Sequence, residues 1–301
     1  MMRWFVKLAT SSAVMAALLW WTDPVIVANQ LRGADARWLF AALASLTLLT
    51  ALMAWRWQHV AQAFDIRISF TQAWREYYIA QLANMALPGG VVGDVGRAYR
   101  IRRQGDLVRA AQSVAAERLI GQISIFALMA AGFSCALMIP GGAAWPVWTW
   151  LAIAAYCIAM CGAVVFARGT SASARFMRLT LVLLKAPRMI GLALVITALL
   201  IFSFYACARA TQTVIPLADL ATLVPLILCA MLIPLSVGGL GWREGAAAAL
   251  FPLIGASPGA GIAAGIAYGA VMLLAALPAV LLALKPTQTH PIPHTSKMDV
   301  L

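Results

Sequence analysis

The sequence predicts an all-α polytopic membrane protein, from its composition, its recurring apolar stretches and the positions of its basic residues. Of 301 residues, 63% are hydrophobic and 11% are charged, whereas an ordinary globular chain is about 45–50% apolar and about 25% charged. Stretches near the roughly 20 apolar residues that cross a bilayer recur along the chain. The bilayer is therefore the expected surroundings, and no room remains for a separate catalytic domain.

Six stretches have the length and apolarity of full spans. They cover residues 4–22, 38–57, 119–139, 147–167, 190–210 and 261–284. Two further apolar stretches, at 76–96 and 220–256, are interrupted in the middle by Pro and Gly. Tryptophans near the span ends, Trp57 among them, fit the role of interfacial anchors.

The basic residues assign the two sides of the membrane. Arginines crowd the connections within 97–118 and 168–188, and the positive-inside rule puts both in the cytoplasm of a bacterial inner membrane, together with the two termini. Most of the 22 basic residues then lie on the cytoplasmic side. The exceptions are Arg32, Arg37, Arg209 and Arg243.

This sidedness constrains the two broken segments. Segment 76–96 has to begin and end on the cytoplasmic side, and segment 220–256 on the periplasmic side. We expect two re-entrant hairpins that enter from opposite faces. Two closely paired full spans would satisfy the same count.

The two breaks also resemble each other. PGGVVGDVGR at 88–97 and PLSVGGLGWR at 234–243 share Pro, Gly and Arg at equal spacing, at an offset of 146 positions. The matches are Pro88 with Pro234, Gly93 with Gly239, and Arg97 with Arg243. We predict an inverted repeat of two three-span halves, 1–145 and 146–285, followed by a disordered tail, 286–301. In transporters built this way, interrupted helices mark the binding site near the midplane.

Irregular backbone at membrane depth is tolerated where it is buried in protein or lines a water-filled cavity. We therefore expect the glycine-rich turns to line a cavity. Each helix that restarts after a turn presents free N–H groups, which favour an anion such as phosphate, and Arg97 and Arg243 add bidentate donors. The turn glycines are Gly89, Gly90, Gly93, Gly238, Gly239 and Gly241.

Acidic and amide side chains lie beside these breaks. Asp94 and Glu244 either act directly on a substrate or proton, or form structural ion pairs, Asp94 with Arg97 or Arg243 and Glu244 with Arg97. Asn84 either binds a head group or caps the broken helix.

Two further features precede or lie within predicted spans. Glu117 and Arg118 fit an interfacial ion pair that sets the depth of a helix. A direct role in substrate binding is the alternative. Glycines spaced by four in the last span, Gly261, Gly265 and Gly269, form a face that allows close helix packing.

Several functional classes have no support in the sequence. The basic residues punctuate apolar spans instead of forming the solvated basic face of a nucleic-acid binder. The glycines 89–93 are not followed by the GK[ST] of a nucleotide loop, and no catalytic set of residues is recognisable. We therefore expect no enzyme activity, no metal and no cofactor.

Three stretches carry a resemblance that covers nearly the whole chain. NMALPGGVVGDVGRAYRIRR at 84–103, AAERL at 115–119 and IPLSVGGLGWREGAAAALF at 233–251 resemble the flippase-like family related to the lysylphosphatidylglycerol synthase transmembrane region. The resemblance implies a membrane protein that moves a lipid, such as an aminoacylated phospholipid, a polyprenyl-linked sugar or a hopanoid-related lipid. The full-length synthases add a soluble aminoacyl-transfer domain. Because this sequence stops at Leu301 without one, we expect no aminoacyl transfer.

By motif position, the resemblance carries over a set of candidate substrate-binding residues. They are Asn84, Pro88, Gly93, Asp94, Arg97, Glu117, Arg118, Pro234, Gly239, Gly241, Arg243 and Glu244. The leading hypothesis is an integral inner-membrane lipid translocator for an anionic or lipid-linked substrate. The alternatives are a non-transporting scaffold that partners a lipid-modifying enzyme, and an ion-coupled transporter of small solutes.

Overall fold

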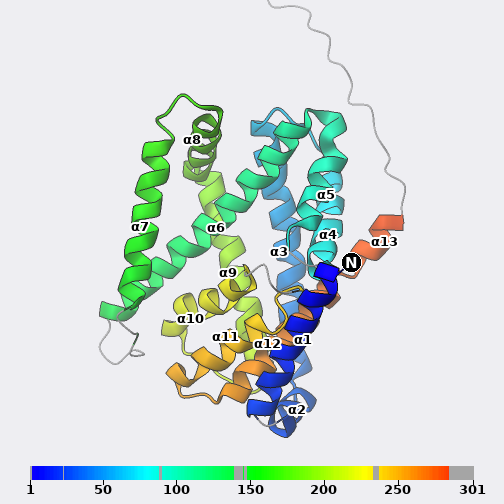
Figure 1. The fold of residues 1–301 in the computed structure, drawn as a ribbon, viewed down its shortest axis with the longest axis vertical. Coiled ribbons are helices and arrows are strands. Elements are labelled where there is room, and N and C mark those ends of the chain that lie inside the picture. Colours follow the sequence, from blue (N-terminus) through cyan, green and yellow to red (C-terminus); the bar gives the residue numbers. More distant parts are fainter. Residues whose placement is uncertain are drawn as a thin grey trace, which may run out of the picture.

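The computed structural model describes residues 2–22, 24–87, 90–138, 145, 148–232 and 237–284, and within this part every regular element is a helix. Figure 1 shows their arrangement. The helices are α1 (Met2–Thr22), α2 (Pro24–Arg32), α3 (Ala36–Ala63), α4 (Phe70–Ala86), α5 (Val92–Ile101), η1 (Arg102–Gln104), α6 (Leu107–Met138), α7 (Trp148–Phe166), α8 (Ala172–Lys185), α9 (Pro187–Ala210), α10 (Leu217–Cys229), η2 (Ala230–Leu232), α11 (Trp242–Leu250), η3 (Phe251–Ile254), α12 (Pro258–Ala276) and α13 (Pro278–Leu284).

Four of the six predicted spans correspond to helices long and apolar enough to cross a membrane. These are Ala36–Ala63, Leu107–Ala136, Pro187–Ala210 and Pro258–Leu284. A fifth candidate is the pair α1 and α2, which is bent by 95°. The remaining predicted span, 147–167, contains a shorter apolar helix, Trp150–Phe166. The chain is thus an all-helical, multi-pass membrane protein.

Two short helices, α2 and α8, were not expected from the sequence. Helix α8 begins after Ser171, whose hydroxyl accepts a hydrogen bond from the Ala174 amide at 3.1 Å. Ser, Thr, Asp and Asn satisfy the free amides at a helix start in this way. Helix α8 then lies beside α6, α7 and α9, and Phe176 packs against Phe64 with ring centroids 6.0 Å apart.

Helix α6 begins twelve residues before the predicted span start at residue 119. Asp106 precedes it, and its carboxylate accepts a hydrogen bond from the Val108 amide at 3.0 Å. This cap starts the helix in polar sequence. Glu117 and Arg118 consequently lie inside α6, about 15 Å along its axis from the first turn, and not at its entrance.

Helices α4 and α5 form an antiparallel hairpin around the first break. Gln104 donates to Gln72 at 2.7 Å, Arg100 pairs with Glu76, and the Gly93 amide donates to Asn84 at 2.7 Å. Residues near the end of α4 thus contact residues near the start of α5, and residues near the start of α4 contact the end of α5 and η1. The hairpin therefore starts and finishes at the same end of the molecule.

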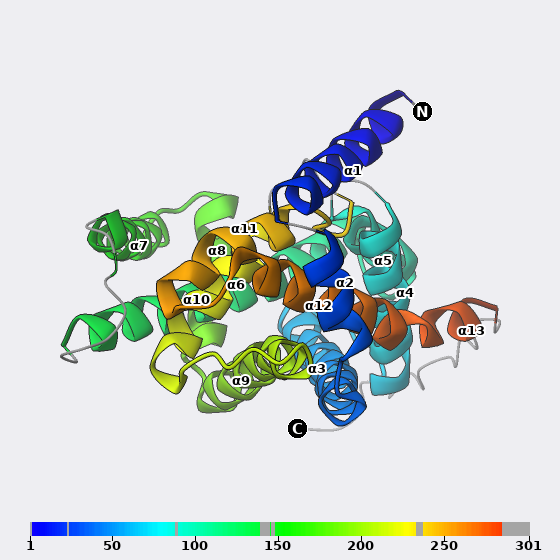
Figure 2. The ribbon, with the colours of Figure 1, turned by 90° about the horizontal axis from the view of Figure 1, so that it is seen from below.

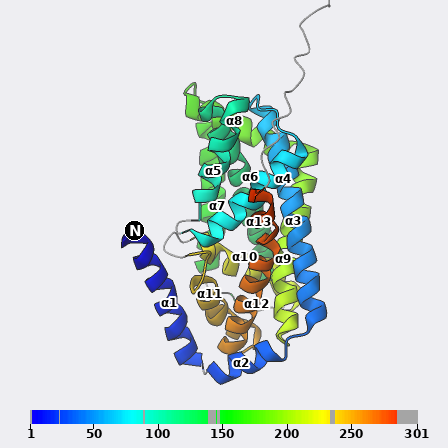
Figure 3. The same ribbon diagram turned by 90° about the vertical axis from the view of Figure 1, so that its right-hand side faces the viewer.

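Helices α3 and α9 also run antiparallel, side by side along one face of the bundle (Figure 3). The Ser45 hydroxyl donates to the Leu199 carbonyl at 2.9 Å, and the Asp35 amide donates to the Ala210 carbonyl at 3.0 Å. Helix α12 packs against both. Large apolar side chains such as Phe40 and Leu194 face outward, 69% and 60% exposed, as expected where the surroundings are lipid.

The arginine-rich connections gather at one end of the molecule. The connections 64–69, 102–106 and 167–171 all lie at the upper end in Figure 1. Arg109, in the first turn of α6, pairs with Asp65 of the connection 64–69 at 3.2 Å. The connections 33–35 and 211–216 lie at the opposite end. Seen from below, α1 and α7 flank α11 on one side of the bundle (Figure 2).

Helix α11 packs closely against the glycine ladder of α12, Gly261, Gly265 and Gly269. A Cβ added at Gly261 would lie 2.4 Å from the Ala247 carbonyl oxygen, and one at Gly265 would lie 3.1 Å from Glu244. A Cβ at Gly269 would fall on the Arg243 guanidinium. The ladder is therefore explained by close packing, as predicted, and it also makes room for two charged side chains.

We predict that Gly261→Ala lowers the thermal stability of the purified protein in detergent. The new methyl group has to displace the α11 backbone, and overpacking of this kind costs about 1–3 kcal/mol. The matched control is Gly162→Ala in α7, where an added Cβ meets nothing within 4 Å and alanine favours the helix by up to about 1 kcal/mol. Equal unfolding temperatures for the two variants would contradict this account of the ladder.

Candidate functional site

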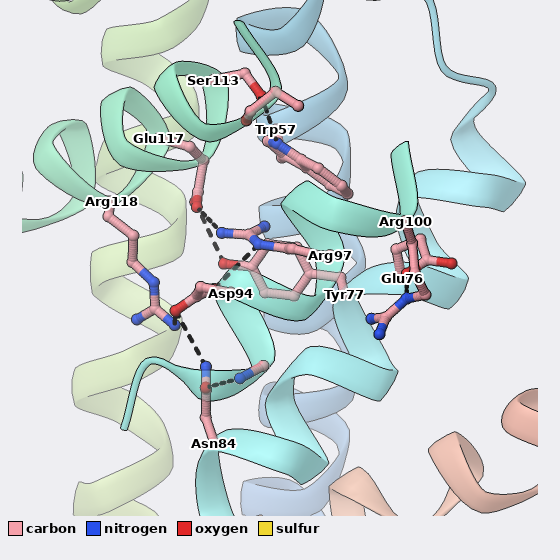
Figure 4. Close-up of polar contacts among 12 residues, drawn as sticks. Trp57, Glu76, Tyr77, Asn84, Asp94, Arg97, Arg100, Ser113, Glu117 and Arg118 are labelled. Atoms are coloured by element: carbon pink, nitrogen blue, oxygen red, sulfur yellow. Dashed lines mark hydrogen bonds and ion pairs between the residues drawn. The ribbon is translucent and has the colours of Figure 1, made fainter. Parts of the chain in front are cut away.

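A buried carboxylate, Glu117 of α6, lies at the centre of a charged network beside the first break (Figure 4). Arg56 of α3 contacts its Oε1 at 2.6 Å, and Arg97 of α5 contacts its Oε2 at 2.9 Å. The Tyr77 hydroxyl of α4 also donates to Oε1, at 3.3 Å. Four helices therefore meet on one carboxylate that is 0% exposed.

Arg97 lies between two aromatic rings and two carboxylates. Its guanidinium carbon lies 4.5 Å from the Trp57 ring centroid and 4.6 Å from that of Tyr77, and cations are attracted to aromatic faces at such distances. Its Nε lies 3.0 Å from the Asp94 carboxylate, as the sequence predicted for one of the alternative pairs. With 0% exposure, Arg97 is fixed in place by its partners.

Asp94 and Arg118 form the more open end of the network. The Arg118 side chain, 41% exposed, approaches Asp94 Oδ2 at 2.5 Å. Asn84 donates to the same oxygen at 3.2 Å and accepts the Gly93 amide. Asn84 is therefore a cap, as one alternative predicted, but it caps α5 across the break and not its own helix. Glu117 and Arg118, expected to pair with each other, instead bind Arg97 and Asp94.

Two glycines allow the network to form. A Cβ at Gly93 would lie 2.0 Å from the Ala80 carbonyl oxygen, so the hairpin closes only because this residue has no side chain. A Cβ at Gly121 would lie 3.0 Å from Arg56 Nη2, one turn after Glu117. Small residues thus bring α5 onto α4 and Arg56 onto α6.

The second break carries a smaller charged group. Arg243 is 2% exposed and pairs with its neighbour Glu244, whose other oxygen accepts the Gly241 amide at 2.7 Å. The expected pair of Glu244 with Arg97 is therefore absent from the described contacts. The Arg243 guanidinium faces the Tyr268 ring at 5.6 Å, and its Nε and Nη1 have no hydrogen-bond partner.

The charged network has no counterpart in sequence at the offset of 146 residues that relates the two breaks. The positions 146 residues after Glu117 and Arg118 are Ala263 and Ala264, and the position after Asp94 is Leu240. Within the breaks themselves, Pro, Val, Gly and Arg recur at this offset. The charged network is therefore specific to the first break.

The two breaks meet at one point. A Cβ at Gly238 would lie 3.0 Å from the Met85 carbonyl oxygen at the end of α4. Helix α1 covers the second break, where the Ser11 hydroxyl accepts the Val237 amide at 3.3 Å and Gly239 and Gly241 are buried. Gly90, in contrast, is exposed and has open space around it.

Three of the predicted site residues, Pro88, Gly89 and Pro234, lie outside the described residues. A cavity between the two glycine turns stays a prediction. The free amides expected at the restarting helices are in part occupied, because Asn84 and Glu244 each accept one of them.

Sequence reasoning missed Arg56, Tyr77 and the role of Trp57. The interpretation of Trp57 as an interfacial anchor was wrong, since it is 0% exposed and donates to Ser113 at 3.4 Å. Its helix continues to Ala63, which moves Trp57 away from the helix end. A signal was present for Arg56, the one charge in the predicted span 38–57.

Residues 4–279 match the family described as the lysylphosphatidylglycerol synthase TM region. The chain belongs to this family. No curated protein and no solved structure matches the chain. Membership of the lysylphosphatidylglycerol synthase TM region family makes the chain a membrane protein of lipid-related processes, and it confirms the relationship predicted from the two Pro-Gly blocks and the Glu-Arg pair.

We predict that Glu117→Gln destabilises the protein by about 3–5 kcal/mol, because it leaves Arg56 and Arg97 buried without a full counter-charge. Asp65→Asn is the matched control. It removes a carboxylate from an ion pair whose side chains are 54% and 80% exposed. An exposed ion pair of this kind contributes about 0–1 kcal/mol to the free energy of unfolding. Thermal unfolding in detergent measures both, and a similar loss for the two variants would mean that the network does not hold the fold.

Proposed function

We propose that the chain is an integral inner-membrane lipid translocator that moves an anionic or lipid-linked substrate between the leaflets. One observation carries the proposal. Three arginines and two carboxylates, Arg56, Arg97, Arg118, Asp94 and Glu117, are gathered beside a break in an apolar helical bundle. Ionisable groups at membrane depth are rare and mark substrate or ion pathways.

The order and contacts of the helices support the predicted inverted repeat, and with it movement between leaflets. Each of the helices α1 to α6 begins between 146 and 151 residues before its counterpart among α7 to α12. The contacts repeat as well, since α4 packs on α5 as α10 packs on α11, and α6 packs on α10 as α12 packs on α4. The equivalent helices α3 and α9 run antiparallel, as an axis in the membrane plane requires.

The lengths of the broken elements support re-entrant hairpins over paired full spans. Helix α4 has 17 residues and α5 has 10. At 1.5 Å per residue these extend about 25 Å and 15 Å, less than the roughly 30 Å of bilayer hydrocarbon. The antiparallel hairpin also returns to the end of the molecule that holds the arginine-rich connections, which the positive-inside rule assigns to the cytoplasm together with both termini.

In the proposed mechanism, the broken hairpins hold a phosphate-bearing head group, and rocking of the two halves exposes it to each leaflet in turn. The alkyl chains remain in the bilayer. Binding and conformational change are the only steps that the chain performs, so the proposal includes no reaction, metal or cofactor. A lipid-modifying enzyme would be a partner only under the scaffold alternative.

We predict that liposomes containing the protein exchange a fluorescent anionic phospholipid between leaflets at least about tenfold faster than protein-free liposomes. Quenching of the outer-leaflet dye measures the exchange. The double variant Arg97→Ala with Arg243→Ala is expected to approach the protein-free rate. Arg109→Gln, which removes an exposed arginine, is the control and should exchange as the wild type does.

Equal exchange in wild type, double variant and protein-free liposomes would remove the proposal. Binding of lipid without exchange would favour the scaffold. Uptake of a small solute with unchanged lipid asymmetry would favour the solute transporter.

A further inference from the structure

The charged network beside the first break contains one positive charge more than it can neutralise. Arg56, Arg97 and Arg118 face the two carboxylates Asp94 and Glu117. Among the described residues, no further acidic side chain forms an ion pair with these three arginines. Because buried charges are stable only when they are compensated, the network lacks one negative charge.

Arg118 is the member that can accept this charge. Arg56 and Arg97 are 2% and 0% exposed and share Glu117, and Arg97 also lies between two aromatic rings. Arg118, in contrast, is 41% exposed and pairs with one carboxylate, that of Asp94. Its Nε has no hydrogen-bond partner, as is also true of the Arg97 Nε and Nη1, but only the Arg118 side chain is partly exposed and can be reached by a ligand.

Asp94 can lose this contact without becoming isolated. Its carboxylate also contacts Arg97 at 3.0 Å and Asn84 at 3.2 Å. These partners remain when Arg118 moves away. The Arg118–Asp94 ion pair is thus the exchangeable contact of the network, while the contacts of Glu117 hold the helices together.

The exchangeable pair borders the side of α5 that faces outward. Val91, Val95 and Tyr99 are 58%, 66% and 53% exposed and lie along one side of the helix. Asp94 lies about 60° around the helix from Val91 and about 100° from Val95, so it is at the edge of that side. In a bilayer these apolar side chains contact lipid, so a lipid head group can approach the pair from the membrane.

We propose that Arg118 binds the single phosphodiester of a phospholipid head group, which replaces Asp94 as its partner. The inference rests on the function proposed above and names its substrate class. A phosphodiester carries one negative charge and neutralises the network, whereas a pyrophosphate carries two or more and leaves it negative. Arginine also matches phosphate oxygens in bidentate geometry. Among the lipids considered from sequence, this chemistry selects phospholipids over pyrophosphate-linked polyprenyl sugars.

The test is a binding titration of the full chain in a phosphate-free sugar detergent. The ligands are a short-chain phosphatidylglycerol, a prenyl pyrophosphate and inorganic phosphate, and ligand-induced thermal stabilisation reports the affinity. We expect the phosphatidylglycerol to bind most tightly. Arg118→Gln should weaken its binding about tenfold or more, because a charge-assisted contact is lost. Asp94→Asn should tighten it, because the competing charge is removed.

The opposite signs of these two effects separate binding from folding. A purely structural ion pair would make both variants less stable and would give neither a higher affinity. The pair Arg109→Gln and Asp65→Asn is the control, since it removes the same charges from an exposed ion pair and should leave the affinity unchanged.

Three results would overturn the proposal: unchanged binding in Arg118→Gln, weaker binding in both network variants, or tighter binding of the pyrophosphate or of inorganic phosphate than of the phosphatidylglycerol. Failure here is distinguishable from failure of the proposed function. Leaflet exchange by the wild type with unchanged binding in Arg118→Gln would leave translocation standing and remove this site. Binding as described without leaflet exchange would keep this site and remove the translocation function.

Discussion

The burial of one carboxylate, that of Glu117, is the constraint on which the rest of the structure depends. An ion removed from water loses several kcal/mol of solvation, and only close partners offset this loss. Glu117 finds Arg56 on α3, Arg97 on α5 and the Tyr77 hydroxyl on α4. Each contact joins α6 to one other helix, and together they connect four helices through one side chain.

The break in the chain and the charged network are parts of the same arrangement. Arg97 reaches Glu117 because the chain turns back after α4, and this return is possible because Gly93 lies directly on the Ala80 backbone. At the second break, the one ion pair of Arg243 among the described residues is with its neighbour Glu244. Among the described residues, the larger charged network therefore lies beside the first break.

Membership of the lysylphosphatidylglycerol synthase TM region family links this chain to lipid-related processes, and the geometry gives that link a physical form. A fixed part of the network, around Glu117, holds the helices. A more exposed part, Arg118 with Asp94, lies next to outward-facing apolar side chains of α5. A lipid has the same division between an ionic head and apolar chains, so both kinds of surface are present where a lipid would need them.

The sequence by itself determined the helical membrane fold, most of the spans and both breaks, and it singled out Asp94, Arg97, Glu117 and Arg118 as candidates, because apolar length and the scarcity of charge are local properties. The pairing of these residues was decided by the tertiary structure. Glu117 lies next to Arg118 in sequence but binds Arg56 and Arg97, which are 61 and 20 residues away. Ion pairs depend on which helix faces meet, and that follows from the packing of the whole bundle, not from spacing along one helix.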